Sequence, residues 1–111
     1  NINQKPILIS ELSFKAEDSG LPNLIGPGYT FKSQRERALW YERYVSHLLS
    51  SPFIVGYIWY KYDDDPPRKM AENSNFGLVN NKNLPYDLFT EKVKEINRKV
   101  YWMAEKKSPE R

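Results

Sequence analysis

The sequence has no cysteine, a single histidine and no long apolar run. Without cysteine the chain can form no disulfide, no thiolate zinc site and no cysteine nucleophile. The one histidine, His47, lies in a stretch with helical spacing, where an isolated histidine is usually a packing or surface residue. No segment approaches the roughly 20 apolar residues of a membrane span. We therefore expect no bound metal, no cofactor and no membrane partner.

The charge of the chain is weak and evenly spread. The formal net charge is +3, and basic residues are mixed with acidic ones, as over residues 91–99. A nucleic-acid binder usually gathers its Lys and Arg into one stripe, so no nucleic-acid partner is expected. Aromatic residues, in contrast, make up 14% of the chain. They serve either core packing or a surface for flat, amphipathic ligands such as sugars.

Two apolar runs have the composition of strands. The first covers residues 5–11 and ends in the carboxylate of Glu11. Because it is apolar at successive positions, it suits a buried parallel strand. The second covers residues 53–60 and is rich in β-branched and aromatic residues.

Each expected strand is followed by a long loop and then by a helix. The loops cover residues 15–32 and 61–83, and the helices cover residues 33–50 and 86–105. Strands that alternate with helices imply parallel pairing and right-handed crossovers. Long loops after the strands, with a tight turn before the second strand, are the asymmetry of a (β/α)8, or TIM, barrel. The sequence therefore predicts an α/β fold with a (βα)2 segment.

Two parallel strands alone leave both outer edges unpaired. Either the rest of a barrel completes the sheet, or several copies of the chain associate. The alternative is a small open α/β domain with residues 76–79 as a third strand. The chain starts at Asn1 rather than Met, which we interpret as a trimmed or processed piece. The acidic run over residues 63–65 lacks the spacing of a calcium loop, so we expect a solvated turn.

Five segments carry further information: PILISELSFKA (6–16), DSGLPN (18–23), QRERA (34–38), VGYIWYKY (55–62) and ENSNFGLV (72–79). Together they resemble the agarase-like glycoside hydrolases, which belong to a clan of retaining (β/α)8 glycosidases. The similarity covers about residues 5–103. It implies that the two strands are barrel strands seven and eight. Residues 1–111 would then form the C-terminal quarter of such a barrel.

The resemblance implies that Glu11 is the catalytic nucleophile. A retaining glycosidase needs this carboxylate and a second carboxyl about 5–5.5 Å away as acid/base. Strand alternation predicts Ile7, Ile9 and Glu11 on one face, with Glu11 at the rim. The alternative is a strand-end glutamate in a salt bridge. The family's acid/base residue lies on strand four, which has no counterpart in this chain.

The resemblance also implies a set of sugar-binding residues. Trp59 matches the strand-eight tryptophan that forms a sugar platform, and Tyr57 would share its face. Glu72, Asn73 and Asn75 are candidate partners for sugar hydroxyls. The alternatives are a tryptophan in the barrel core and a loop held by side-chain-to-backbone hydrogen bonds.

Two functions follow from the sequence. The first is part of a glycoside hydrolase acting on β-linked polysaccharide, with an agarose-like galactan as the substrate that the family name suggests. It would use a retaining two-carboxylate mechanism and be inactive as this piece alone. The alternative is a non-catalytic carbohydrate-binding or structural module derived from such a barrel. Both predict carbohydrate as a partner.

Overall fold

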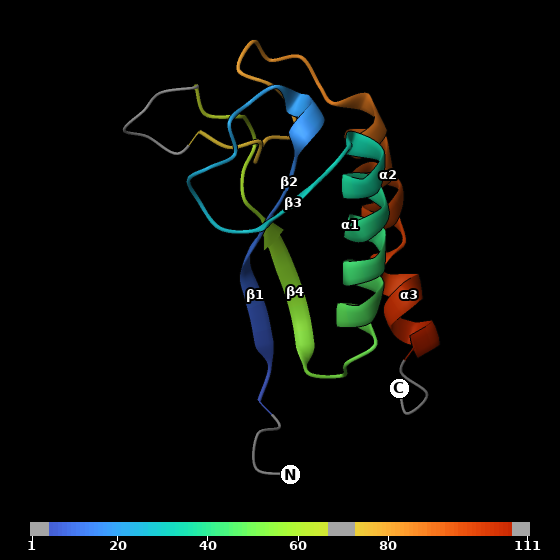
Figure 1. Cartoon of the computed structure of the whole chain (residues 1–111). Coiled ribbons are helices and arrows are strands. Elements are labelled where there is room, and N and C mark those ends of the chain that lie inside the picture. Colours follow the sequence, from blue (N-terminus) through green and yellow to red (C-terminus); the bar gives the residue numbers. More distant parts are fainter. Residues whose placement is uncertain (1–4, 67–72, 108–111) are drawn as a thin grey trace.

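The computed structural model describes residues 5–66 and 73–107. Two long strands stand beside a layer of helices, and the loops gather at one end of the strands (Figure 1). The elements are β1 (Ile7–Leu12), β2 (Phe14–Ala16), a 3-10 turn (Glu17–Ser19), β3 (Tyr29–Phe31), α1 (Gln34–Leu49), β4 (Ile54–Trp59), α2 (Asp87–Arg98) and α3 (Val100–Lys107).

Strands β1 and β4 pair in parallel, as predicted, but their register is irregular. Ile9 lies opposite Tyr57 and Leu12 lies opposite Trp59, so three steps along β1 match two steps along β4. This bulge brings Leu12 to the helix-facing side with Ile9, and both pack in the core. Glu11 is exposed. Glu11 falls within the irregular stretch between Ile9 and Leu12, so the unbroken alternation that placed Ile9 and Glu11 on one face does not hold there.

Helix α1 begins with the expected cap. The Ser33 hydroxyl accepts a hydrogen bond from the Glu36 amide at 3.2 Å. The Glu36 carboxylate accepts one from the amide of Lys32, the residue before the cap, at 2.9 Å. These bonds satisfy amide groups that have no partner inside the helix.

The core lies between the helices and the inner face of β1 and β4. It is built mainly from residues of α1 and α2, among them Tyr41, Val45, Phe89 and Ile96. In the described part of the chain, no helix is both long and apolar enough to cross a membrane.

The helix predicted over residues 86–105 is two helices. Helix α2 ends at Arg98, and Lys99 adopts φ −104° and ψ 2° while its amide bonds the Ile96 carbonyl. Helix α3 then follows, and Met103 packs against the core. No glycine or proline marks this break in the sequence, so helical spacing alone merged the two elements.

Two further strands form where the sequence predicted a loop over residues 15–32. They are β2 and β3, residues 14–16 and 29–31, which pair in parallel as a second two-stranded sheet. Residues 76–79, the alternative third strand, are not a strand; Val79 makes only isolated bridges to Asp63 and Pro85. The described residues thus form a small open α/β arrangement, the alternative that the sequence left open.

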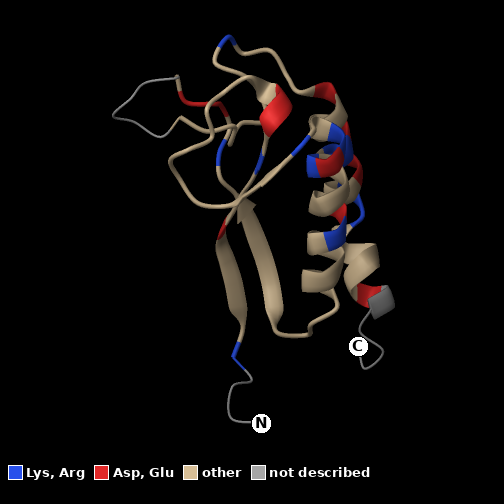
Figure 2. Ribbon diagram, in the orientation of Figure 1, with Lys and Arg blue, Asp and Glu red and all other residues tan. Residues whose placement is uncertain are grey.

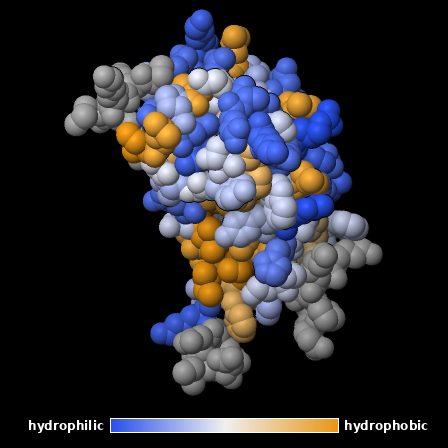
Figure 3. All heavy atoms as spheres, viewed as in Figure 1, coloured by the Kyte–Doolittle hydropathy of each residue, from blue (hydrophilic) through white to orange (hydrophobic). Residues whose placement is uncertain are grey.

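One face of the β1–β4 sheet is covered by helices and the other is not. Figure 3 shows apolar side chains gathered over these strands. Large apolar side chains of the two strands remain exposed, among them Leu8 at 53% and Ile58 at 52%. The sheet therefore has an open apolar face.

Two tyrosines and one asparagine tie the sheet to the helices. The hydroxyls of Tyr41 and Tyr57 both donate to the Asn97 side-chain oxygen, at 2.7 and 2.6 Å. Burial raises the pKa of both phenols, and it also raises that of Tyr86. The folded state therefore favours the neutral phenols.

These raised pKa values predict a loss of stability in alkali. In the unfolded chain the phenols ionise around 10.0, so above that pH the unfolded state binds fewer protons than the folded state. The free energy of unfolding should be unaffected by these groups below pH 10 and fall above it. Urea unfolding at several pH values, with tyrosinate absorbance, measures this. Replacing the 85% exposed Tyr101 by Phe should leave the loss unchanged. Full ionisation of Tyr41, Tyr57 and Tyr86 before any unfolding would contradict it.

Candidate functional site

The carboxyl ends of β1 and β4 lie at the same end of the molecule, where the long loops gather (Figure 1). Strand β1 carries one charged residue, Glu11, near this end (Figure 2). Parallel α/β proteins bind their ligands at this end of the strands.

Glu11 borders a groove of about 240 Å³ at the end of β1, which we call the Glu11 groove. Its lining residues are Glu11, Leu12, Ser13, Phe14, Pro27, Gly28 and Tyr44. Gly28 has φ +94°, and a Cβ there would lie 2.7 Å from the Ser13 carbonyl oxygen, so the loop passes close over Ser13. Among the described residues, none forms an ion pair with Glu11. The alternative of a salt-bridged strand end thus finds no partner in that part of the chain.

Trp59 and Tyr57 face the helices. The Trp59 indole N–H donates to the Phe76 carbonyl at 2.9 Å. Its ring lies 5.0 Å from that of Phe89 and 5.9 Å from that of Tyr41. Tyr57 is half-buried, and its hydroxyl is bonded to Asn97. These contacts match the alternative in which the tryptophan packs in the core. They leave no indole donor for a sugar hydroxyl.

Asn73 and Asn75 hold loops together. The Asn73 side-chain oxygen accepts from the amides of Leu24 and Ile25, both at 3.0 Å. Asn75 is fully buried, and its side-chain oxygen accepts from the Ala16 amide at 3.1 Å. These bonds fit the alternative of a loop fixed by side-chain-to-backbone bonds. Glu72, the third predicted partner of sugar hydroxyls, lies outside the described residues.

Asp64 is buried, contrary to the solvated turn predicted for residues 63–65. It is 3% exposed. One carboxylate oxygen accepts from the Asn75 side-chain amide at 2.9 Å and from the Gly77 amide at 2.8 Å; the other accepts from the Tyr86 hydroxyl. Its neighbour Asp65 instead pairs with Lys61. In the described ranges no cluster of three His, Asp or Glu residues is placed to hold a metal.

Arg37 joins helix α1 to the segments that follow both strands. Its side chain donates to the Phe14 carbonyl at 2.9 Å, after β1, and to the Gly77 carbonyl at 2.7 Å, after β4. It also donates to Gln34 at 2.9 Å, and the guanidinium lies 4.0 Å from the centre of the Phe89 ring. Complete burial lowers the pKa of Arg37 to about 9, so it is still charged at neutral pH.

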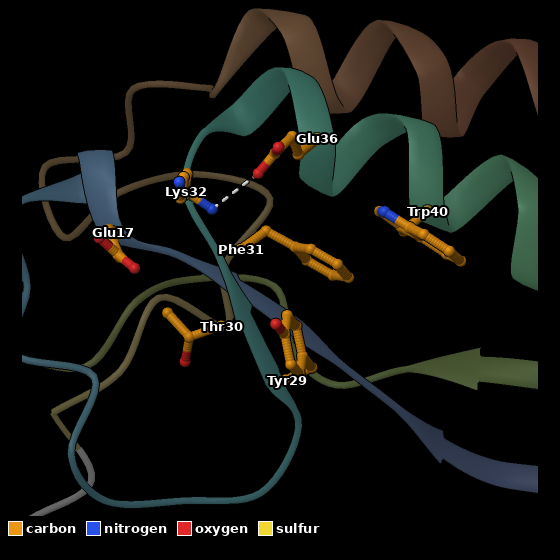
Figure 4. Close-up of a pocket in the computed structure, with 7 residues that line it drawn as sticks. All are labelled: Glu17, Tyr29, Thr30, Phe31, Lys32, Glu36 and Trp40. Carbon is orange, nitrogen blue, oxygen red and sulfur yellow. Dashed lines mark hydrogen bonds between the residues drawn. The ribbon is translucent and has the colours of Figure 1, made fainter.

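A second groove, of about 510 Å³, opens between β3 and the first half of α1 (Figure 4). We call it the aromatic groove; it is lined by Glu17, Tyr29, Thr30, Phe31, Lys32, Glu36 and Trp40. The rings of Phe31 and Trp40 are stacked, with centres 5.9 Å apart and 9° between their planes. Sequence reasoning missed this groove, because its residues were assigned to a loop and to a helix face.

Comparisons with known proteins confirm the resemblance. No protein-family model matches the chain. Beta-agarase B of Vibrio sp. (strain JT0107) is 36% identical over 106 residues, which are 93% of this chain and 11% of that protein. Beta-agarase A of the same strain is 33% identical over 100 residues, or 87% of this chain and 10% of that protein.

Solved structures show the same relation. BpGH50 superposes with a TM-score of 0.80 at 30% identity and covers 89% of this chain, which matches 20% of BpGH50. An exo-beta-agarase gives 0.79 at 33% identity, with 88% of this chain and 13% of that one covered. The mixed α/β arrangement therefore matches part of these structures. The chain spans 10–11% of the length of the curated relatives.

The Arg37 contacts predict a large loss of stability in Arg37→Met. The substitution leaves the carbonyls of Phe14 and Gly77 buried without their donor, so the free energy of unfolding should fall by about 3 kcal/mol or more. Urea unfolding followed by circular dichroism measures this. Arg35→Met removes the same charge from an exposed position of the same helix and should cost less than about 0.5 kcal/mol. Equal losses in both variants would contradict the role of Arg37.

Asn75→Asp should destabilise the chain in a pH-dependent way. The new carboxylate would lie against that of Asp64 in a buried site, which costs about 3 kcal/mol or more at neutral pH. Like-charge contact raises the folded pKa of this pair, so the loss should shrink as the pH falls toward about 4. Thermal unfolding at both pH values tests this. The control is Asn81→Asp, at an exposed position; a pH-independent loss for Asn75→Asp would count against the mechanism.

Proposed function

We propose that this chain is part of a glycoside hydrolase that acts on β-linked galactan. The observation that carries the proposal is the position of Glu11. It lies at the carboxyl end of β1 and borders a groove, in a chain that aligns over 87–93% of its length with β-agarases. A carboxylate at this end of a parallel strand suits attack on a glycosidic bond.

In the proposed mechanism Glu11 is the nucleophile of a retaining reaction. Its carboxylate oxygen bonds to the anomeric carbon while the glycosidic C–O bond breaks and a second carboxyl group protonates the leaving oxygen. Water then attacks the anomeric carbon, gives its proton to that second group and releases Glu11. In the Glu11 groove, Glu11 is the single carboxylate among the lining residues. The second carboxyl must therefore come from elsewhere, and we propose that the chain alone is inactive.

The proposed architecture is the last quarter of a (β/α)8 barrel, with β1 and β4 as neighbouring strands. Three features support it. The strands are parallel, the helices cover one face, and the other face exposes apolar residues such as Leu8 and Ile58. In a closed barrel that second face is packed with side chains. We propose that the rest of a barrel, or further copies of this chain, covers it.

The predicted sugar-binding residues then take two kinds of role. Trp59 and Tyr57 support the site from the helix side of the sheet, and Asn73 and Asn75 fix the loops around it. Glu72 stays a proposed direct partner for a sugar hydroxyl. A non-catalytic carbohydrate-binding module is the second candidate, favoured by the single carboxylate in the Glu11 groove.

A chimera tests the catalytic proposal. In it, this chain replaces the matching stretch of a β-agarase such as the Vibrio relative. The chimera should release reducing sugar from agarose, and Glu11→Gln should lower kcat by at least about a thousandfold, because the amide cannot form the glycosyl ester. Glu91→Gln, at an exposed position of α2, is the matched control and should keep full activity.

Four results would count against the proposal. Full hydrolysis by the Glu11→Gln chimera would show that Glu11 is not the nucleophile. Hydrolysis by this chain alone would show that the chain needs no second carboxyl group from elsewhere. An initial product with inverted anomeric configuration, read by NMR, would reject the retaining mechanism. If the parent β-agarase is active but the chimera with the unsubstituted chain is not, the result would favour the non-catalytic module.

A further inference from the structure

We propose that the aromatic groove is a second carbohydrate site, which binds another stretch of the same neutral polysaccharide beside the Glu11 groove. This inference rests on the proposed function for the kind of ligand, but it assigns a separate place and separate residues. The groove holds about 510 Å³, which lies within the range of ordinary small-molecule sites.

The aromatic rings of the groove present surface that suits a sugar. Tyr29 is 68% exposed and Trp40 is 41% exposed, so both offer ring surface to a ligand. Phe31 lies between them, 4.7 Å from the ring centre of Tyr29 and 5.9 Å from that of Trp40. The apolar C–H face of a pyranose packs against such rings. On the helix side, Arg43 lies 4.9 Å from the Trp40 ring and helps to hold it.

The polar groups of the groove favour a hydroxylated, neutral ligand. Figure 4 shows Glu17, Thr30, Lys32 and Glu36 around the rings. Glu36 is fixed, because one of its oxygens accepts the Lys32 amide at 2.9 Å. Carboxylates accept hydrogen bonds from sugar hydroxyls. Two acidic groups against one basic group disfavour an anionic ligand such as nucleic acid.

The two grooves are neighbours. Gly28 lines the Glu11 groove and Tyr29, the next residue, lines the aromatic groove. On α1, Tyr44 lines the Glu11 groove and Trp40 lines the aromatic groove. The two residues are one helical turn apart, so they lie on the same face of the helix. A polysaccharide chain that occupies one groove can therefore extend into the other. This continuity is why we assign the same kind of ligand to both.

The test is an NMR titration of the full chain, labelled with nitrogen-15, by a neutral agarose hexasaccharide up to about 10 mM. The chain has three tryptophans, so the indole N–H signals are few and assignable. We expect a saturable shift of the Trp40 signal and little change for the packed Trp59. Tyr29→Ala should weaken binding at least about tenfold. Because Tyr29 is largely exposed, this variant should keep its fold, which the unchanged signals of other residues verify.

Two controls separate this inference from the proposed catalytic role. Glu11→Gln should still give a saturable shift of the Trp40 signal, whatever it does to hydrolysis in the chimera. Tyr101→Ala, which removes an 85% exposed aromatic ring on α3, should leave the Trp40 titration unchanged. An active Glu11→Gln chimera with intact groove binding would reject the nucleophile and keep the groove.

Three outcomes would overturn the inference. The first is no saturable shift of Trp40, and the second is a shift that Tyr29→Ala leaves as it was. The third is a Trp40 signal that moves with the concentration of the chain and not with sugar, which would make the groove a contact between copies.

Discussion

The structure depends on the burial of one cation. Arg37 is 0% exposed, and its guanidinium donates to the backbone after β1, to the backbone after β4 and to its own helix. Taking a charge out of water is costly unless all of its donors find acceptors. The ring of Phe89 at 4.0 Å and the buried carboxylate of Asp64 compensate further. Because the bonds of Arg37 reach three separate segments, they fix how the loops stand over the sheet.

The sequence predicted the parts of the fold that depend on local patterns. Strands β1 and β4, helix α1 and its cap follow from apolar spacing and from Ser33 and Glu36, and they form close to the expected positions. What it could not predict are contacts across long separations. Arg37 and Gly77 are 40 residues apart, and in a sequence both Arg37 and Asp64 look like solvated surface charges. The bulge in β1 is equally invisible, because nothing in residues 7–12 marks where the alternation breaks.

The candidate site shows the same limit. A resemblance can match Trp59 and Asn75 to a sugar-binding pattern, because tryptophan and asparagine serve both ligand binding and packing. Only their surroundings separate the two uses. The Trp59 N–H is taken up by the Phe76 carbonyl, and Asn75 is enclosed by loop backbone and Asp64. In contrast, Tyr29 and Trp40 keep free surface, although no pattern in the sequence had marked them.

The asparagine contacts also have a mechanical consequence. Asn73 binds the amides of Leu24 and Ile25, and the amide of Asn75 donates to Asn23, across about 50 positions of sequence. The loop between the 3-10 turn and β3 is therefore joined to residues 73–75 by several hydrogen bonds. These bonds restrict the movement of one segment relative to the other. A ligand that binds against either segment therefore contacts a surface that is already ordered, so binding costs little conformational entropy of the protein.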